Sequence, residues 1–340
     1  MAPAPQPLKH LVPGWYATVM GLTGLALAWH RAAPLMGPMA EAVALVVGGL
    51  AALVFAALTV ATVLRAQRHP EAWAEDRRHP VRHTFIATLP IAAILLATVA
   101  VALFGPTPAG HALWVAGAVG QLWVTLWVLG RWWRPGGQPG AGSAAGGGLA
   151  WAGVTPALLI PIVGNVLTPL AGVPLGHAEW AAAQFGIGLL FWPVVLVLIV
   201  VRIAVQGLWP ERLLPAGFIL VAPPAVVGLS ALQLGAPEVL AWLCWGVALF
   251  TLGWVAQLLP RIRHLPFSVA HWGMSFPIAA LAALTLRLAT PGGLLAVLGP
   301  VLLAAASLLV LVLLLSTVRG LRDGSLLQPE PVAVITVAQP

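Results

Sequence analysis

Ten apolar stretches, each roughly 20–25 residues long, follow one another along this chain of 340 residues. An α-helix of about 20 residues rises about 30 Å, which is the thickness of the hydrocarbon core of a bilayer. Hydrophobic residues make up 60% of the chain and charged residues 7%, whereas soluble proteins average about 25% charged residues. We therefore predict an all-α polytopic membrane protein with ten transmembrane helices, at roughly 13–33, 40–64, 84–105, 110–131, 151–173, 178–202, 212–234, 237–259, 266–290 and 293–318.

The distribution of basic residues indicates the orientation in the membrane. If the N-terminus is cytoplasmic, all of the 16 Lys and Arg residues except Arg31 and Arg287 fall in cytoplasmic segments. Because cytoplasmic loops carry an excess of Lys and Arg, both termini are predicted to be cytoplasmic in a multi-pass protein of the cell inner (plasma) membrane. The bilayer is thus the expected surrounding, and the high pI requires no nucleic-acid partner.

The loops and termini define the expected domain organisation. A leader, residues 1–12, precedes a single membrane domain, residues 13–318, and a cytoplasmic tail follows at 319–340. The charged segment 65–83 is predicted to form a short interfacial helix with a solvated face. The segment 134–148 is rich in Gly and Ser and is interpreted as a flexible cytoplasmic linker. A nucleotide-binding loop is excluded, because these glycines are not preceded by a strand and followed by a helix, as such a loop requires.

Proline recurs at similar depth in the odd-numbered stretches, whereas the even-numbered ones are mostly uninterrupted aliphatic runs apart from Pro193 and Pro300. The first stretch has Gly21 and Gly24 near its middle instead. A backbone carbonyl freed by proline must be satisfied by protein or water inside a membrane. We therefore expect five helical hairpins, each with a kinked helix facing inward and a smooth helix facing lipid. The odd-stretch prolines are Pro90, Pro156, Pro161, Pro169, Pro223, Pro224 and Pro277.

The ninth stretch places a bulky ring, Phe276, directly before Pro277 near the expected middle of the membrane. No Asp, Glu, Lys or Arg lies near the middle of any stretch, which argues against a proton-coupled carrier. The single cysteine, Cys244, rules out an intrachain disulfide, and we expect no cofactor, no metal site and no enzymatic activity. The histidine nearest to Phe276 is His271, for which ordinary packing is the simpler interpretation.

A largely neutral, narrow pore favours anions weakly when backbone dipoles and a basic cytoplasmic mouth raise the local potential. Side chains that offer hydrogen bonds to a passing anion are Thr88, Asn165, Thr168 and Ser275. Each of these residue types is also common in helix–helix contacts, so both interpretations stay open.

Four stretches carry a resemblance to a known family. They are LVPGWYATVMGLTGLALAW, HPVRHTFIATLPIAAILLA, LPAGFILVAPPAVVGL and PFSVAHWGMSFPIAALAALTLRLA, and IPIVGNVLTPLAG fits more loosely. Together they resemble the tellurite-resistance/dicarboxylate transporter family, which includes TehA-type bacterial proteins, plant slow-type anion channels, malate permeases and sulfite exporters. The linker 134–148 has no evident counterpart in that resemblance.

The resemblance implies ten transmembrane helices, arranged as five hairpins in a quasi-fivefold ring around a central pore. In the branch of TehA and the plant channels it also implies homotrimers with one pore per subunit and a phenylalanine gate in the ninth helix. The matching residue here is Phe276, and Pro277 stands where some members have glycine. The pore-lining candidates are Gly21, Thr88, Pro90, Pro161, Asn165, Thr168, Phe218, Pro223, Pro224, Ser275 and Pro277.

Three functions remain open at this point. The first is a channel for small inorganic or organic anions, gated at Phe276. The second is a secondary carrier or exporter for a C4-dicarboxylate such as malate, for sulfite or for tellurite. The third is a membrane scaffold or sensor that transports nothing. No side chain in the sequence discriminates between the anions.

Overall fold

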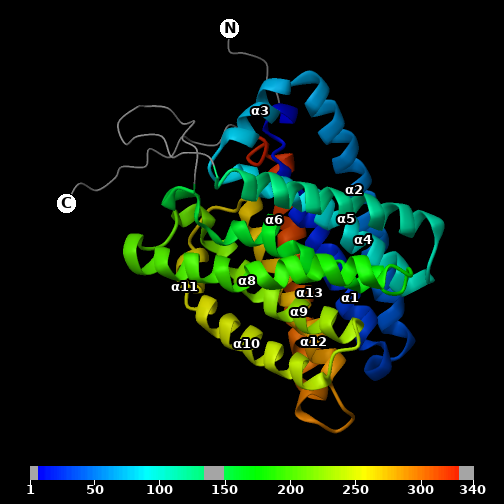
Figure 1. Cartoon of the computed structure of the whole chain (residues 1–340). Coiled ribbons are helices and arrows are strands. Elements are labelled where there is room, and N and C mark those ends of the chain that lie inside the picture. The colour runs from blue at the N-terminus through cyan, green and yellow to red at the C-terminus, as the bar shows by residue number, and fades with distance from the viewer. Residues whose placement is uncertain (1–6, 134–148, 329–340) are drawn as a thin grey trace.

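The computed structural model describes residues 7–133 and 149–328, and no strand occurs among them (Figure 1). The first residues of the expected leader, the expected linker 134–148 and the end of the expected tail lie outside this part of the chain. Four short helices lie between or before the long ones. They are η1 (Pro7–His10), α3 (Pro70–Arg78), η4 (Trp151–Gly153) and α11 (Leu259–Ile262).

Eight helical segments of the described chain are long and apolar enough to cross a membrane. They are α2 (Pro38–Arg68), η3 with α4 (Arg82–Phe104), α5 (Pro108–Gly130), α8 (Ala178–Gln206), η7 with α9 (Glu211–Gln233), α10 (Glu238–Ala256), η8 with α12 (Val269–Leu288) and α13 (Leu294–Arg322). The first expected span is η2 (Pro13–Tyr16) with α1 (Ala17–Met36), which carries His30 and Arg31 and is not among the eight.

The fifth expected span is not one continuous helix. Four short pieces replace it, namely η5 (Pro156–Leu158), α6 (Leu159–Val163), η6 (Gly164–Leu167) and α7 (Pro169–Gly172). Prolines 156, 161 and 169 interrupt the backbone hydrogen bonding at intervals too short for a long helix to form. Of the ten expected transmembrane helices, eight therefore correspond to segments of the described chain that are long and apolar enough to cross a membrane, the first corresponds to the less apolar α1, and the fifth is this broken span.

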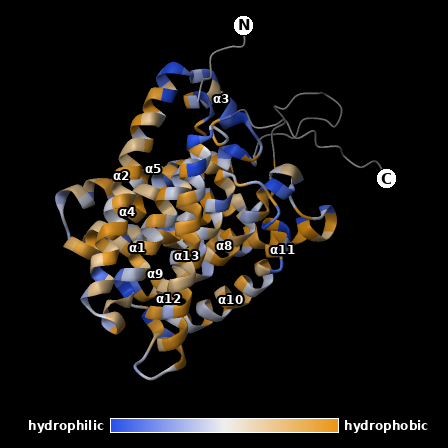
Figure 2. Ribbon diagram, turned by 180° about the vertical axis from the view of Figure 1, so that it is seen from behind, coloured by the Kyte–Doolittle hydropathy of each residue, from blue (hydrophilic) through white to orange (hydrophobic). Residues whose placement is uncertain are grey.

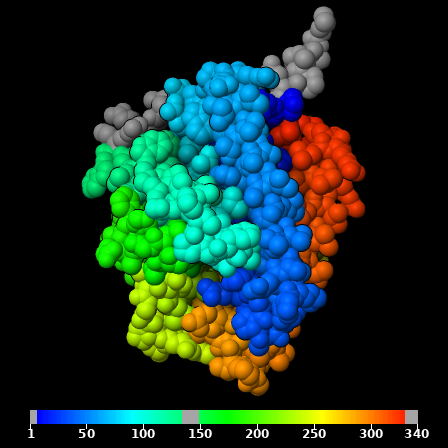
Figure 3. All heavy atoms as spheres, turned by 90° about the vertical axis from the view of Figure 1, so that its right-hand side faces the viewer, coloured from blue at the N-terminus to red at the C-terminus, as the bar shows by residue number. Residues whose placement is uncertain are grey.

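The spans separate into two groups by burial. Of the most apolar window of each span, 67% is buried in η3–α4, 83% in η7–α9 and 72% in η8–α12, against 17–39% in α2, α5, α8, α10 and α13. We call η2–α1, η3–α4, η5–α7, η7–α9 and η8–α12 the inner spans, and the other five the outer helices. Figure 3 shows α2 along the full length of one outer face, with α5 and α13 on either side.

The inner spans contact one another in a closed order. α1 packs against α4, α4 against α7, α7 against α9, α9 against α12, and α12 again against α1. Each outer helix packs against the inner span that precedes it in the chain, as α2 does on α1 and α13 on α12. Hydrophilic residues gather around α3 and towards α11, whereas the long helices are mostly hydrophobic (Figure 2).

Two inner spans, η3–α4 and η8–α12, change from 3₁₀ to α geometry two residues before a proline. α4 begins at Thr88, two residues before Pro90, and α12 begins at Ser275, two residues before Pro277. Each proline thus lies in the first turn of an α-helix, where its fixed φ fits helical geometry and its ring is tolerated far better than in the interior of a helix. The expected kink in the middle of a helix is thus replaced by a change of helix type at the proline.

Two hydroxyl groups satisfy the backbone at these junctions. Thr88 Oγ1 donates to the carbonyl of Phe85 at 2.6 Å, and Ser275 Oγ donates to the carbonyl of Trp272 at 2.7 Å. Each hydroxyl lies two residues before its proline and reaches three residues back. The same local chemistry therefore closes the junction in two of the inner spans.

Candidate pore and basic mouth

A cavity of about 910 Å³ lies between the inner spans, and all five of them contribute to its wall. It is also bordered by α3 and by the start of the expected tail, where Ser325 and Leu326 lie. Within each inner span, the lining residue farthest along the chain is Met20, Ile91, Leu167, Val226 or Pro277. The described residues beyond these positions in the same spans do not line the cavity. It therefore reaches from one end of the bundle to the level of Phe276 and Pro277.

The Phe276 ring lies at the deep end of the cavity and packs against α1. Its side chain is 8% exposed. A Cβ added at Gly24 would lie 2.8 Å from Cδ2 of this ring, and one added at Gly21 would lie 2.2 Å from Ser275 Oγ. Glycine at both positions lets α1 approach α12 closely, and this approach leaves room for the ring beside the α1 backbone.

The candidate residues from the sequence occupy different places. Thr88, Pro223, Phe276 and Pro277 line the cavity together, and Pro90 lines a smaller cavity of about 310 Å³ between α2, α4 and α5. The remaining candidates are not part of the wall of the large cavity and are buried among the helices. They are Gly21, Pro161, Asn165, Thr168, Phe218, Pro224 and Ser275.

The polar candidates of the fifth span make hydrogen bonds within the protein. Asn165 Nδ2 donates to Thr125 Oγ1 at 2.8 Å, and Asn165 Oδ1 accepts from Gln184 Nε2 at 2.8 Å. Thr168 Oγ1 donates to the carbonyl of Asn165 at 2.9 Å. Since both side chains are fully buried, these contacts hold the broken span against its neighbours.

Sequence reasoning missed the outer-helix residues that complete this packing. Gln121 Nε2 in α5 donates to the carbonyls of Ile160 and Pro161 at 3.2 and 2.9 Å, and Thr125 Oγ1 donates to the Pro161 carbonyl at 2.6 Å. A broken span leaves carbonyls without intrahelical partners, and neighbouring side chains must satisfy them inside a membrane. In the sequence, the isolated glutamines within the apolar runs of α5 and α8 indicate such hydrogen-bonding residues.

The mouth of the cavity is basic. Its lining includes Lys9, Arg65, Arg82 and Arg212, with Glu75 as an acidic member. The sequence predicts a basic cytoplasmic mouth but does not identify the residues that form it. A positive mouth in front of an apolar passage raises the local concentration of anions.

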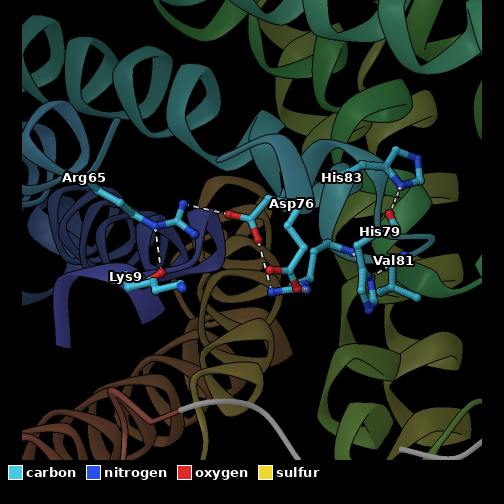
Figure 4. Close-up of polar contacts among 8 residues, drawn as sticks. Lys9, Arg65, Asp76, His79, Val81 and His83 are labelled. Atoms are coloured by element: carbon cyan, nitrogen blue, oxygen red, sulfur yellow. Dashed lines mark hydrogen bonds and ion pairs between the residues drawn. The ribbon is translucent and has the colours of Figure 1, made fainter. Parts of the chain in front are cut away.

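The charged segment 65–83 has the expected exposed face, but two of its charged side chains are buried. Arg65 Nη1 pairs with Asp76 Oδ2 at 2.7 Å, and the two side chains are 2% and 0% exposed. Arg82 pairs with Asp76 at 3.2 Å and also with Glu75, and Arg65 Nε donates to the carbonyl of Lys9 at 3.1 Å. Figure 4 shows this network, which attaches α3 and the N-terminal segment to the mouth.

A histidine at the mouth is held in its neutral form. His79 Nδ1 accepts hydrogen bonds from the backbone N–H groups of Val81 and Arg82, at 3.1 and 3.0 Å (Figure 4). Burial lowers the pKa of His79 to about 4, and the charges of Arg82 and Arg212 act in the same direction. Near neutral pH the positive charge of the mouth therefore comes from lysine and arginine.

These features define a polytopic helical membrane protein with a central cavity that opens at a basic mouth. The chain belongs to the voltage-dependent anion channel (SLAC1) family, whose model matches residues 10–318. This is a family of anion channels and transporters, and it includes the TehA and plant S-type channel relatives to which the chain is similar.

Similar proteins include one from a bacterium and two from a plant. The chain is 25% identical over 276 residues to the tellurite resistance protein TehA homolog of Haemophilus influenzae, a match that covers 80% of this chain and 79% of the relative. It is 24% identical over 333 residues to the S-type anion channel SLAH2 of Arabidopsis thaliana, covering 96% of this chain and 62% of the relative. For S-type anion channel SLAH3 of the same plant the identity is 27% over 266 residues, covering 77% of this chain and 40% of the relative.

Proposed function

We propose that this protein is a passive anion channel whose pore follows the axis of the inner spans and is closed by the Phe276 ring. In the proposed architecture, ten membrane-crossing segments form five hairpins in a quasi-fivefold ring, with the outer helices against lipid. The closed order of contacts from α1 through α4, α7, α9 and α12 supports that ring. The observation that carries the proposal is the cavity, which begins among basic residues and ends at Phe276.

The electrostatics of the cavity favour small anions over cations. Each inner span begins at the mouth, so the positive ends of the helix dipoles point towards an entering ion. Farther in, the wall is mostly aliphatic, and Thr88 gives its hydroxyl hydrogen to the carbonyls of Pro13 and Phe85. An anion in the deep part therefore meets few strong donors, and such weak binding favours rapid passage over tight coupling.

The proposal includes the orientation and the assembly. The basic mouth faces the cytoplasm of a cell whose inner (plasma) membrane holds the protein, because the positive-inside rule assigns basic segments to that side. The assembly is a homotrimer with one pore in each subunit, as the resemblance to the TehA and plant-channel branch implies. The mass of the purified protein in detergent, corrected for bound detergent, tests the trimer.

The gate is tested by anion flux in proteoliposomes that contain the wild type or Phe276→Ala. We expect Phe276→Ala to raise chloride and nitrate flux at least tenfold, because the ring is removed from the deep end of the cavity. Phe250→Ala is the matched control, since Phe250 lies on the outer helix α10 and is 75% exposed. The gate is contradicted if Phe276→Ala conducts anions no faster than the wild type, provided that the variant is monodisperse and reconstitutes normally.

The same vesicles separate the other functions. Malate, sulfite and tellurite are offered under an imposed proton gradient. Saturable uptake that follows the gradient would replace the channel by a secondary carrier. Absence of flux for every anion, in both the wild type and Phe276→Ala, would favour the scaffold or sensor.

A further inference from the structure

We propose that His111 and His177 form a binding site for a divalent transition-metal ion, at the end of the bundle opposite the basic mouth. His111 lies in the first turn of α5, and His177 immediately precedes α8. Their Nε2 atoms are 2.6 Å apart and are directed at each other. The two residues are separated by 66 positions in the chain. The spacing of the two histidines in the sequence therefore does not predict the pair, which forms only in the tertiary structure.

Hydrogen bonds of the backbone fix the two turns that carry these histidines. The His111 N–H donates to the carbonyl of Thr107 at 2.9 Å, and Thr107 Oγ1 accepts from the N–H of Gly110 at 3.1 Å. The His177 N–H donates to the carbonyl of Gly172 at 2.8 Å. Both side chains are thus presented from closed turns, so little conformational entropy is lost when a ligand joins them.

A buried tryptophan orients the His177 ring. The indole of Trp114 is stacked on it, with ring centroids 5.2 Å apart and an interplanar angle of 6°. Trp114 is 2% exposed, and its Nε1 donates to the carbonyl of Thr168 at 3.1 Å. An imidazole that shares the charge of a metal ion lies favourably over the electron-rich face of an indole.

The distances suit a metal after a small movement. Two imidazole nitrogens that bind one tetrahedral zinc ion at about 2.0–2.1 Å lie about 3.3 Å apart, so the pair has to open by about 0.7 Å. His111 is exposed, and rotation of its side chain supplies this movement. No third His, Cys, Asp or Glu completes a cluster with this pair among the described residues. Water therefore occupies the other positions of the metal, and imidazole ligands favour copper, nickel and zinc over magnesium or calcium.

The chemical consequence is a bridge between two hairpins. A metal ion at this pair joins the start of α5 to the loop between α7 and α8 (right-hand side of Figure 1). An ion that binds the folded protein and not the unfolded chain stabilises the fold by RT ln(1 + c/Kd), where c is the free ion concentration, so the stabilisation grows with the logarithm of that concentration once it exceeds Kd. This inference does not depend on which anion the protein conducts, or on whether it conducts one.

The test uses protein purified through a tag without histidine, in detergent at pH 7.5, and titrated with Zn²⁺ and with Cu²⁺. The expected result is one saturable site per chain, a higher melting temperature with Zn²⁺, and nitrogen hyperfine coupling in the Cu²⁺ electron paramagnetic resonance spectrum. His111→Gln and His177→Gln should each weaken binding at least tenfold. The control is His264→Gln, at an exposed histidine outside the pair, and it should leave metal binding unchanged.

A measurement on the wild type keeps the test decisive if a variant fails to fold. Diethyl pyrocarbonate modifies accessible imidazoles, and Zn²⁺ should protect His111 and His177 but leave His264 reactive when peptides are analysed by mass spectrometry. The proposal is overturned if Zn²⁺ and Cu²⁺ show no saturable binding, if His264→Gln weakens binding as much as the other two variants, or if Zn²⁺ gives the pair no protection.

Discussion

The inner spans and the outer helices are both apolar, yet they are built on different principles. The inner spans pack glycine, proline and hydroxyl groups at close range, as Gly21 does against Ser275. The outer helices expose large aliphatic and aromatic side chains, such as Val46 and Phe250, on the surface of the bundle. In lipid the hydrophobic effect does not distinguish these two environments, so close packing and satisfied polar groups decide which helices lie inside.

The comparison extends to the polar residues of the outer helices. Gln121 and Gln184 lie on α5 and α8 but are fully buried, because they serve the broken inner span beside them. A single glutamine in an otherwise apolar helix thus indicates an outer helix that donates hydrogen bonds to a broken inner span. The broken inner span depends on these hydrogen bonds from the outer helices, which are themselves continuous.

The largest effect is expected where charges join an outer helix to an inner span. Asp76→Ala removes the partner of Arg65 in α2 and of Arg82 at the start of η3. Breaking a buried ion pair from one side costs about 3–5 kcal/mol, because a charge is left buried without compensation. Thermal unfolding in detergent measures the loss, and Glu41→Ala on the exposed face of α2 is the control. Equal melting temperatures for Asp76→Ala and the wild type would show that the link carries no stability.

The next effect contrasts glycine in the two groups. Gly21→Ala should destabilise the protein by about 1–3 kcal/mol, because its new methyl group overlaps Ser275. Gly49 lies in the outer helix α2, and a Cβ added there meets no atom of the described chain within 4 Å. Gly49→Ala should therefore leave stability unchanged or raise it slightly. Equal unfolding midpoints for the two variants would remove the packing distinction between inner and outer positions.

A smaller effect is expected from the amide that supports the broken span. Gln121→Leu keeps the volume but removes the donor to the carbonyls of Ile160 and Pro161. Hydrogen bonds between membrane helices contribute about 1 kcal/mol each, and Thr125 still donates to Pro161 in this variant. Hydrogen exchange of the fifth span should rise, whereas Leu126→Ala on the exposed face of α5 should leave it unchanged. Unaltered exchange in Gln121→Leu would mean that the broken span holds its own geometry.

The last effect is absent at neutral pH and appears only as a dependence of stability on acid pH at the mouth. The pKa of His79 is lowered from 6.5 to about 4, mainly by burial, so the folded protein prefers the neutral ring. The unfolded chain takes up the proton first as the pH falls, and stability from this group is therefore lost between pH 6.5 and pH 4. His79→Asn keeps an acceptor for Val81 and Arg82 without titrating, so its melting temperature should fall less over this range. Parallel pH profiles for the two proteins would assign the dependence to other groups.

Much of this architecture could be predicted from local patterns. The span boundaries agree with the observed helices to within a few residues, and the short interfacial helix expected in segment 65–83 is α3. Phe276 and Pro277 could be singled out because an aromatic ring beside proline is conspicuous in an apolar run. The change from 3₁₀ to α geometry at Thr88 and Ser275 could not be predicted, because proline at the start of a helix and proline within one look alike in a sequence.

The chain by itself determined that this is a helical membrane protein, which segments are long and apolar, and which of them carry proline, since length and hydropathy are local properties. Only the tertiary structure decided which polar side chains contact one another. It buried Asp76 with Arg65, placed Gln121 on a broken span and brought His111 to His177. Such contacts join residues far apart in the chain, and their partners follow from how the hairpins pack against one another.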